Sequence, residues 1–272
     1  NVVLFSLNKH LENLLPLLKE ILTEATFPQK EIDTFVQNSL QKILVNREKV
    51  EYLAQKKYME ILYGKNHYIG YTAEEDDYKN ISRETLLPFY SASYTADNCT
   101  VIISGKINDE SISLLEKYFG SNDWKGKIQQ AKSFEAIPTS FEEKYFVEKK
   151  DAVQSALRIG KHMINRNHPD WSGLRFTNTI LGGYFGSRLM SNLREDKGFC
   201  YGIYSALYSF FDHGHVLIAS EVGSDVTKQA VDEIFFEINR LRNEVASTFG
   251  ISDLFFTSPT FITRLNGNSS WQ

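Results

Sequence analysis

The sequence of 272 residues contains little cysteine, no long apolar run and no block of like charges. Its two cysteines, Cys99 and Cys200, lack metal-binding spacing, so we expect two buried free thiols in strands, and they leave the cellular compartment open. No stretch approaches the roughly 18 apolar residues of a transmembrane helix, so we expect no membrane span. The net charge of −4 is spread along the chain, which argues against a nucleic-acid partner.

Metal-binding motifs are also missing. Neither H-x-x-E-H nor H-E-x-x-H occurs anywhere in the sequence. His10 and Glu12 lie two apart on an expected helix and would face different sides of it, so they cannot share a metal ion. His213 and His215 flank a glycine at an expected hairpin tip, where we expect them to face solvent. The sequence therefore predicts no metal ligands in this chain.

Two further enzyme signatures are incomplete. Gly182-Gly183 lacks the lysine of a P-loop and the spacing of a dinucleotide-binding turn, so it is interpreted as a helix stop. Ser187 lies in Gly-Ser-Arg, not in G-x-S-x-G, so a nucleophile elbow is not supported.

The sequence does contain enough apolar residues for a sizeable core. It is 42% hydrophobic and 13% aromatic, and its length fits one large domain or two ordinary ones. Each half follows the order strand, helix, helix, strand, helix, which predicts an α+β fold with a mixed or antiparallel sheet and helices on one face. We expect a first domain, a linker without periodicity, a second domain and an atypical tail, at residues 1–120, 121–142, 143–250 and 251–272.

Local patterns place the individual elements. Ser82 and Asn108 are expected helix caps, a long helix from residue 29 should bend near Asn46, and the acidic run at 74–77 is typical of a solvated loop. Apolar runs and alternation predict strands at residues 1–7, 98–105, 143–149, 153–161, 201–209 and 214–222.

One stretch has the composition expected of a functional site. Arg194 closes a short expected helix, and Tyr201 opens the strand that follows the turn at Gly198, so both side chains are able to point into one cleft. The alternative is structural: a cation at a helix C-terminus and a half-buried strand aromatic. A guanidinium and a phenol are both hydrogen-bond donors at neutral pH, suited to a peptide carbonyl that gains negative charge.

This stretch resembles a known family. Residues 181–190 and 193–205 are similar to the second domain of the pitrilysin/insulinase-type zinc metallopeptidases, which include the mitochondrial processing peptidases. Further similar segments outside this motif are residues 61–70, 87–90, 94–105 and 154–160. The resemblance as a whole spans residues 8–245.

The resemblance implies two homologous α+β domains facing each other across a cleft. In the family one domain holds zinc through H-x-x-E-H and a downstream glutamate, and the other supplies an arginine and a tyrosine that grip the substrate. Arg194 and Tyr201 match those two positions. The glutamate position falls on Gln41-Lys42, which are poor zinc ligands, while Glu48 and Glu51 come too late in the helix. Any H-x-x-E-H would precede Asn1, so we expect a missing N-terminal part.

The favoured hypothesis is a non-catalytic, substrate-gripping subunit of a heteromeric zinc metallopeptidase that acts on extended peptides. It is expected to be inactive alone, to pair with a zinc-bearing homologous subunit or with a second copy, and to bind no cofactor itself. One alternative is a fragment of an active zinc metalloendopeptidase whose H-x-x-E-H lies upstream. Another is a scaffolding member of the family without a peptidase role.

Overall fold

The computed structural model describes residues 1–120, 124, 126, 144–150, 152–249 and 261–265, the last five and 245–249 by their backbone. Contacts divide the chain into two compact units, residues 1–43 with 73–133 and residues 44–72 with 134–272. These units differ from the domains expected from the sequence, because 44–72 pack with the second half of the chain. Most of the expected linker lies outside the described residues. Within those residues no helix has the length and apolarity needed to cross a bilayer.

The first unit is helical in its described part. Its elements are η1 (Asn8–His10), α1 (Leu11–Thr23), most of α2 (Gln29–Arg47), α4 (Glu75–Lys79), α5 (Arg83–Ser93), η2 (Ala96–Asn98) and α6 (Asp109–Phe119). The two predicted caps are confirmed. Ser82 Oγ accepts a hydrogen bond from the Thr85 amide at 3.3 Å, and Asn108 Oδ1 accepts one from the Ser111 amide at 3.0 Å.

Three expectations for the first unit are wrong. Residues 1–7 and 98–105 form no strand, and Ile102 is 87% exposed, as a strand forms only where a second strand satisfies its backbone. Cys99 lies on the second of these segments and is exposed, not buried. The acidic run begins the short helix α4, because Glu74 and Asp77 form a reciprocal capping box at its N-terminus.

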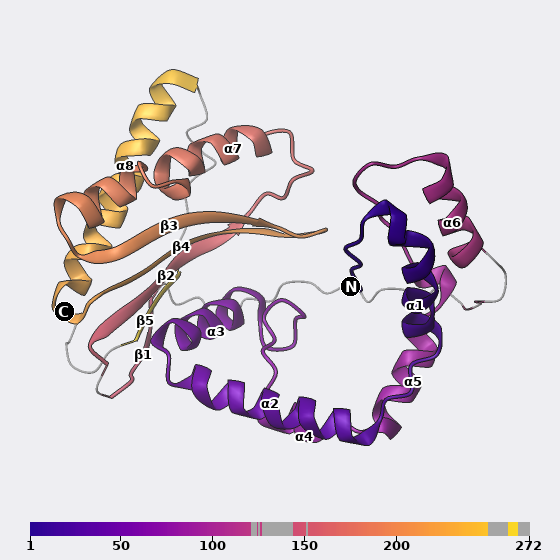
Figure 1. Cartoon of the computed structure of the whole chain (residues 1–272). Coiled ribbons are helices and arrows are strands. Elements are labelled where there is room, and N and C mark those ends of the chain that lie inside the picture. Colours follow the sequence, from indigo (N-terminus) through magenta and orange to yellow (C-terminus); the bar gives the residue numbers. More distant parts are fainter. Residues whose placement is uncertain (121–123, 125, 127–143, 151, 250–260, 266–272) are drawn as a thin grey trace. The chain divides into compact units, whose positions relative to one another are not determined.

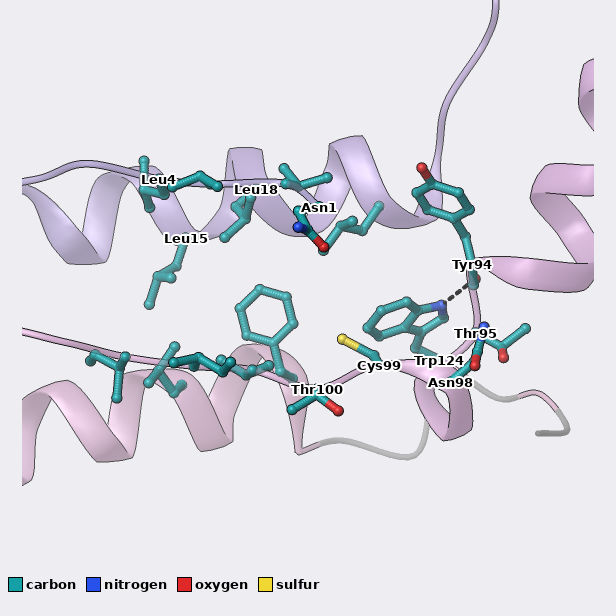
Figure 2. Close-up of a pocket in the computed structure, with 18 of the residues that line it drawn as sticks. Asn1, Leu4, Leu15, Leu18, Tyr94, Thr95, Asn98, Cys99, Thr100 and Trp124 are labelled. Carbon is teal, nitrogen blue, oxygen red and sulfur yellow. Dashed lines mark hydrogen bonds between the residues drawn. The ribbon is translucent and has the colours of Figure 1, made fainter. Parts of the chain in front are cut away.

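An apolar pocket of about 720 Å³ lies between the two extended segments and the helices α1 and α6 (Figure 2). Leu15 and Leu18 of α1 line it on one side, and residues 98–103 line it on the other. Trp124 lies at one end, where its indole N–H donates to the Tyr94 carbonyl at 3.0 Å. The first unit thus has an apolar interior that its described residues cover only in part.

A five-stranded mixed sheet forms the second unit, in the order β1-β5-β2-β4-β3. The strands are β1 (Lys144–Val147), β2 (Gln154–Met163), β3 (Cys200–Ser209), β4 (Gly214–Gly223) and β5 (Phe261–Leu265). β5 is parallel to β1, and the other neighbouring pairs are antiparallel. The mixed helix-and-sheet prediction is confirmed here. β5 comes from the tail that the sequence left unassigned, and β3 is an edge strand.

Helices cover both faces of this sheet, which corrects the expectation of helices on one face (Figure 1). On one face lies α3 (Val50–Tyr63). On the other lie α7 (Trp171–Asn178), η3 (Thr179–Gly183), η4 (Met190–Asp196) and α8 (Thr227–Phe249), the last preceded by the turn η5 (Ser224–Val226).

The physical reason for this two-sided cover is the apolar run in the central strand β4. Ile218 packs in one core cluster with Ile234 of α8, whereas Leu217 packs in another with Tyr58 of α3. Because successive side chains of a strand point to opposite faces, a run that is apolar throughout needs cover on both sides.

Candidate functional site

Arg194 and Tyr201 lie on either side of a tight turn. Arg194 is on η4, and Tyr201 is the second residue of the edge strand β3. Gly198 has a φ of 65°, a left-handed conformation that glycine adopts without steric cost, and this allows the sharp reversal between the two elements. The strand begins with a bulge between Cys200 and Ile203, so Tyr201 lies outside the regular pairing with β4.

The guanidinium of Arg194 lies against two aromatic rings. Its central carbon is 4.8 Å from the ring centre of Phe185 and 5.2 Å from that of Tyr201. Such contacts orient a cation by its attraction to the ring face. The Glu195 carboxylate is 3.4 Å from Arg194 Nε. The structure therefore brings the two predicted side chains together and adds Phe185, which the sequence reasoning did not name.

Exposure separates the two candidates. Tyr201 is 89% exposed, whereas the Arg194 side chain is 29% exposed. An exposed tyrosine beside an oriented arginine offers a phenol and several N–H donors to a molecule at the surface. Within the described residues no strand pairs with the outer edge of β3, so its backbone also faces outward.

Close packing beneath the site fixes η3 onto β3. A Cβ atom at Gly182 would lie 2.6 Å from the backbone nitrogen of Ser205, so only glycine fits there without movement. Asn178 donates to the Ser205 carbonyl at 2.9 Å, and the Ser205 hydroxyl donates back to Asn178 Oδ1 at 2.6 Å. Both side chains are buried. These contacts hold the segment that carries Phe185.

A second set of contacts fixes η4 onto α8. The Asn192 amide donates to Glu233 at 3.0 Å and to Glu237 at 2.8 Å. Lys197 is 2.9 Å from Glu233, and the hydrogen bonds from Lys197 and Asn192 lower the pKa of the Glu233 carboxyl. Arg194 is thus carried by a segment that is tied down on both sides of it.

Most of the chain matches one known protein family. The model described as "Peptidase M16 inactive domain" matches residues 80–248. The chain belongs to the peptidase M16 family. This confirms the resemblance to the pitrilysin/insulinase-type zinc metallopeptidases.

Curated relatives include both active-type and inactive-type names. The "Uncharacterized zinc protease YmxG" of Bacillus subtilis is 27% identical over 230 residues, covering 84% of this chain and 55% of the relative. The "Probable inactive metalloprotease YmfF" of the same organism is 25% identical over 251 residues, covering 86% of this chain and 58% of the relative. The chain therefore spans little more than half the length of these relatives.

Solved structures agree on the fold. A peptidase M16 inactive domain from Pseudomonas fluorescens has a TM-score of 0.79 at 19% identity, over 98% of this chain and 77% of that one. A protease from Helicobacter pylori has a TM-score of 0.73 at 15% identity, over 96% of this chain and 78% of that one. At such identities the likeness concerns the fold alone.

The described side chains offer no set of ligands for the zinc that the family resemblance implies for one domain. Among the described residues no group of three His, Cys, Asp or Glu side chains is placed to hold a metal ion. Gln41 and Lys42, where the resemblance led us to expect the glutamate ligand, are exposed on α2. Glu48 is instead 2.8 Å from Lys149.

The expectation for the hairpin histidines is partly wrong. His215 is 1% exposed, and its Nδ1 lies 2.8 Å from the Tyr63 hydroxyl of α3, because the start of β4 directly after the turn is covered by that helix. Burial lowers the pKa of His215 to about 4. His213 is half-buried and also lies beside Tyr63. These histidines belong to the packing between α3 and the sheet.

Proposed function

We propose that this chain is a non-catalytic, substrate-gripping subunit of a heteromeric zinc metallopeptidase that acts on extended peptides. The observation that carries the proposal is the Arg194 guanidinium held against Phe185 and Tyr201 beside the edge of β3, which no described strand pairs with. Arg194 and Tyr201 are donors that suit a peptide carbonyl or its oxyanion. An exposed strand edge suits the backbone of an extended peptide.

In this proposal the zinc belongs to a homologous partner chain with a complete site. The chain is then built from two homologous domains that face each other across a cleft. The partner's metal would activate the attacking water, while Tyr201 and Arg194 anchor the peptide or stabilise the charge that develops on its carbonyl. The poor ligand set at Gln41 and Lys42 supports this division of labour.

The decisive experiment is Tyr201→Phe in a pair reconstituted with a zinc-bearing homologue from the same source. Loss of an oxyanion donor costs on the order of 10²-fold in kcat. We expect a fall of that size in peptide turnover, and a comparable fall for Arg194→Gln. Both side chains lie at the surface of the turn, so thermal unfolding should change little.

Tyr204→Phe is the matched control, because Tyr204 lies on the same strand, is 48% exposed and is outside the Arg194 contact. Its turnover should equal that of the unsubstituted pair. Unchanged turnover in Tyr201→Phe would instead favour a scaffolding member of the family.

A fragment of an active peptidase is the second candidate, because the chain spans little more than half the length of a relative named as a zinc protease. Elemental analysis of the purified chain distinguishes the two. The subunit proposal expects no stoichiometric zinc and no peptidase activity from the chain alone, and one zinc ion per chain would overturn it. An H-x-x-E-H in the full-length gene upstream of Asn1 would favour the fragment.

A further inference from the structure

A polar cavity of about 680 Å³ lies where η4 and the turns around it pack on α8. Its wall carries four acids and three bases: Asp196, Asp232, Glu233, Glu237, Arg188, Lys197 and Arg240. Arg188, Asp196 and Lys197 fall within the stretch that resembles the family, but the proposed substrate grip uses none of the seven side chains.

Two acceptor atoms in this cavity are buried and unsatisfied. Glu237 is 3% exposed; its Oε1 accepts the hydrogen bond from Asn192, but its Oε2 has no hydrogen-bond partner among the described residues. Asn192 is 9% exposed, and its Oδ1 likewise lacks a partner within that part of the chain. An unsatisfied buried polar group costs about 1–3 kcal/mol, more when it is charged, so both oxygens favour a ligand with donors.

The bases of the wall are already engaged. Lys197 pairs with Glu233 at 2.9 Å. Arg188 and Arg240 both pair with Glu244, and these contacts lower the pKa of that carboxyl. Arg188 Nη1 is itself buried without a partner in the described residues, yet its charge is met by Glu244.

The acids of the wall are in excess. Asp196 and Asp232 are exposed at the rim of the cavity and make no ion pair within the described chain. Among the cations that the structure describes, only Arg240 forms an ion pair with Glu237, at 4.0 Å from its Oε1. The described side chains of the wall therefore carry one more acid than base, and the two buried oxygens of Glu237 and Asn192 have no donor among them.

We propose that this cavity binds a protonated alkylamine, whose ammonium group donates to Glu237 Oε2 and Asn192 Oδ1. An ammonium group has three N–H donors, enough for both oxygens and one further contact. An anion is disfavoured by the excess of acids, and a divalent metal by the lack of a group of three ligands among the described residues. Asp196 and Asp232 would attract a second amino group at the rim.

The same ammonium chemistry comes from a free polyamine or from a lysine side chain of another protein. Isothermal titration calorimetry of the full chain at neutral pH and low salt would separate them, with spermidine as one probe and Nα-acetyl-lysine amide as the other. We expect saturable binding with one site per chain. Binding of spermidine alone identifies a free polyamine as the ligand, whereas binding of both probes identifies a lysine side chain.

Glu237→Gln tests the site directly, because it keeps the Asn192 contact at the δ-carbonyl and removes the charge. We expect at least a tenfold loss of spermidine affinity. The Asp232→Asn variant, changed on the exposed rim, should fold normally and lose spermidine affinity several-fold. This keeps the test valid if the buried Glu237→Gln variant is unstable. Asp225→Asn is the charge-matched control, since Asp225 lies in η5 and outside the cavity, and its affinity should be unchanged.

Several results would overturn the proposal. These are the absence of saturable amine binding, equal affinity in Asp232→Asn and the unsubstituted chain, and displacement of spermidine by Mg²⁺ at equimolar concentration. None of them bears on the Tyr201 experiment, so the two proposals fail independently.

Discussion

Gly182 lies at the closest approach of η3 to β3. A methyl group there would lie 2.6 Å from the Ser205 nitrogen and 2.7 Å from its Cβ, and neither atom is the end of a flexible chain. The absence of a side chain at Gly182 therefore allows the close packing that positions the site. The sequence predicts a helix stop at Gly182-Gly183, and the structure adds this packing reason.

Gly182→Ala should destabilise the second unit by about 1–3 kcal/mol, because the added methyl overpacks the contact with β3. Urea unfolding followed by circular dichroism would measure the change. Gly202→Ala is the matched control on β3, where a Cβ would meet nothing within 4 Å. Equal free energies of unfolding for the two variants would contradict this prediction, because they would show that the η3–β3 contact relaxes to accommodate the added methyl group.

At the scale of elements, α3 is joined to the sheet by buried polar contacts as well as by apolar packing. The Tyr58 hydroxyl donates to the Val216 carbonyl at 2.7 Å, and His162 Nε2 lies 2.7 Å from the Leu62 carbonyl. Tyr63 meets His215 across the same interface. A helix from the first half of the chain is thereby held against strands of the second.

This interface should loosen in acid. Burial lowers the pKa of His215 to about 4, below its usual 6.5, so between these values the folded state binds fewer protons than the unfolded state. The contribution of His215 to the free energy of unfolding is therefore fully present above about pH 6.5 and falls as the pH drops. At pH 4 it is smaller by roughly 3 kcal/mol. Burial also lowers the pKa of His162, which adds to the same trend.

Urea unfolding between pH 4 and 7 would measure this effect. His215→Asn retains an acceptor near the Tyr63 hydroxyl but does not titrate, so its stability should depend less steeply on pH. His168→Asn, at an exposed position, should keep the original slope. An unchanged slope in His215→Asn would contradict the assignment.

Some elements follow from local sequence and others do not. The Ser82 and Asn108 caps and the hairpin of β3 and β4 rest on interactions within a few residues, so the pattern predicts them. The run Val101–Ile103 has strand composition but no strand beside it among the described residues, and it stays extended and exposed. Strand formation depends on a distant partner that local composition does not specify.

At the scale of the whole molecule, the two units differ in the size of their cores. Among the described residues the first unit buries three large apolar side chains below the surface, Leu15, Ile32 and Ile43, whereas most of the buried apolar residues belong to the second unit. Local stability follows the density of buried apolar contacts. The first unit should therefore open at a lower free energy.

Native-state hydrogen exchange followed by mass spectrometry would test this difference. We expect amides in α1 and α6 to exchange by opening at a lower free energy than amides in β4 and α8, with protection weakest next to the pocket of Figure 2. Equal protection in both units would indicate one cooperative core and contradict the prediction.

The sequence alone determined the mixed helix-and-sheet class, the main hairpin, the glycine turn and the pairing of Arg194 with Tyr201, because each depends on periodicity or on residues close together in the chain. Only the tertiary structure decided the two-sided cover of β4, the burial of His215, the place of Phe185 beside Arg194 and the cavity at Glu237. Each of these joins segments that are distant in sequence or adds a contact that spacing leaves open, and such contacts depend on packing.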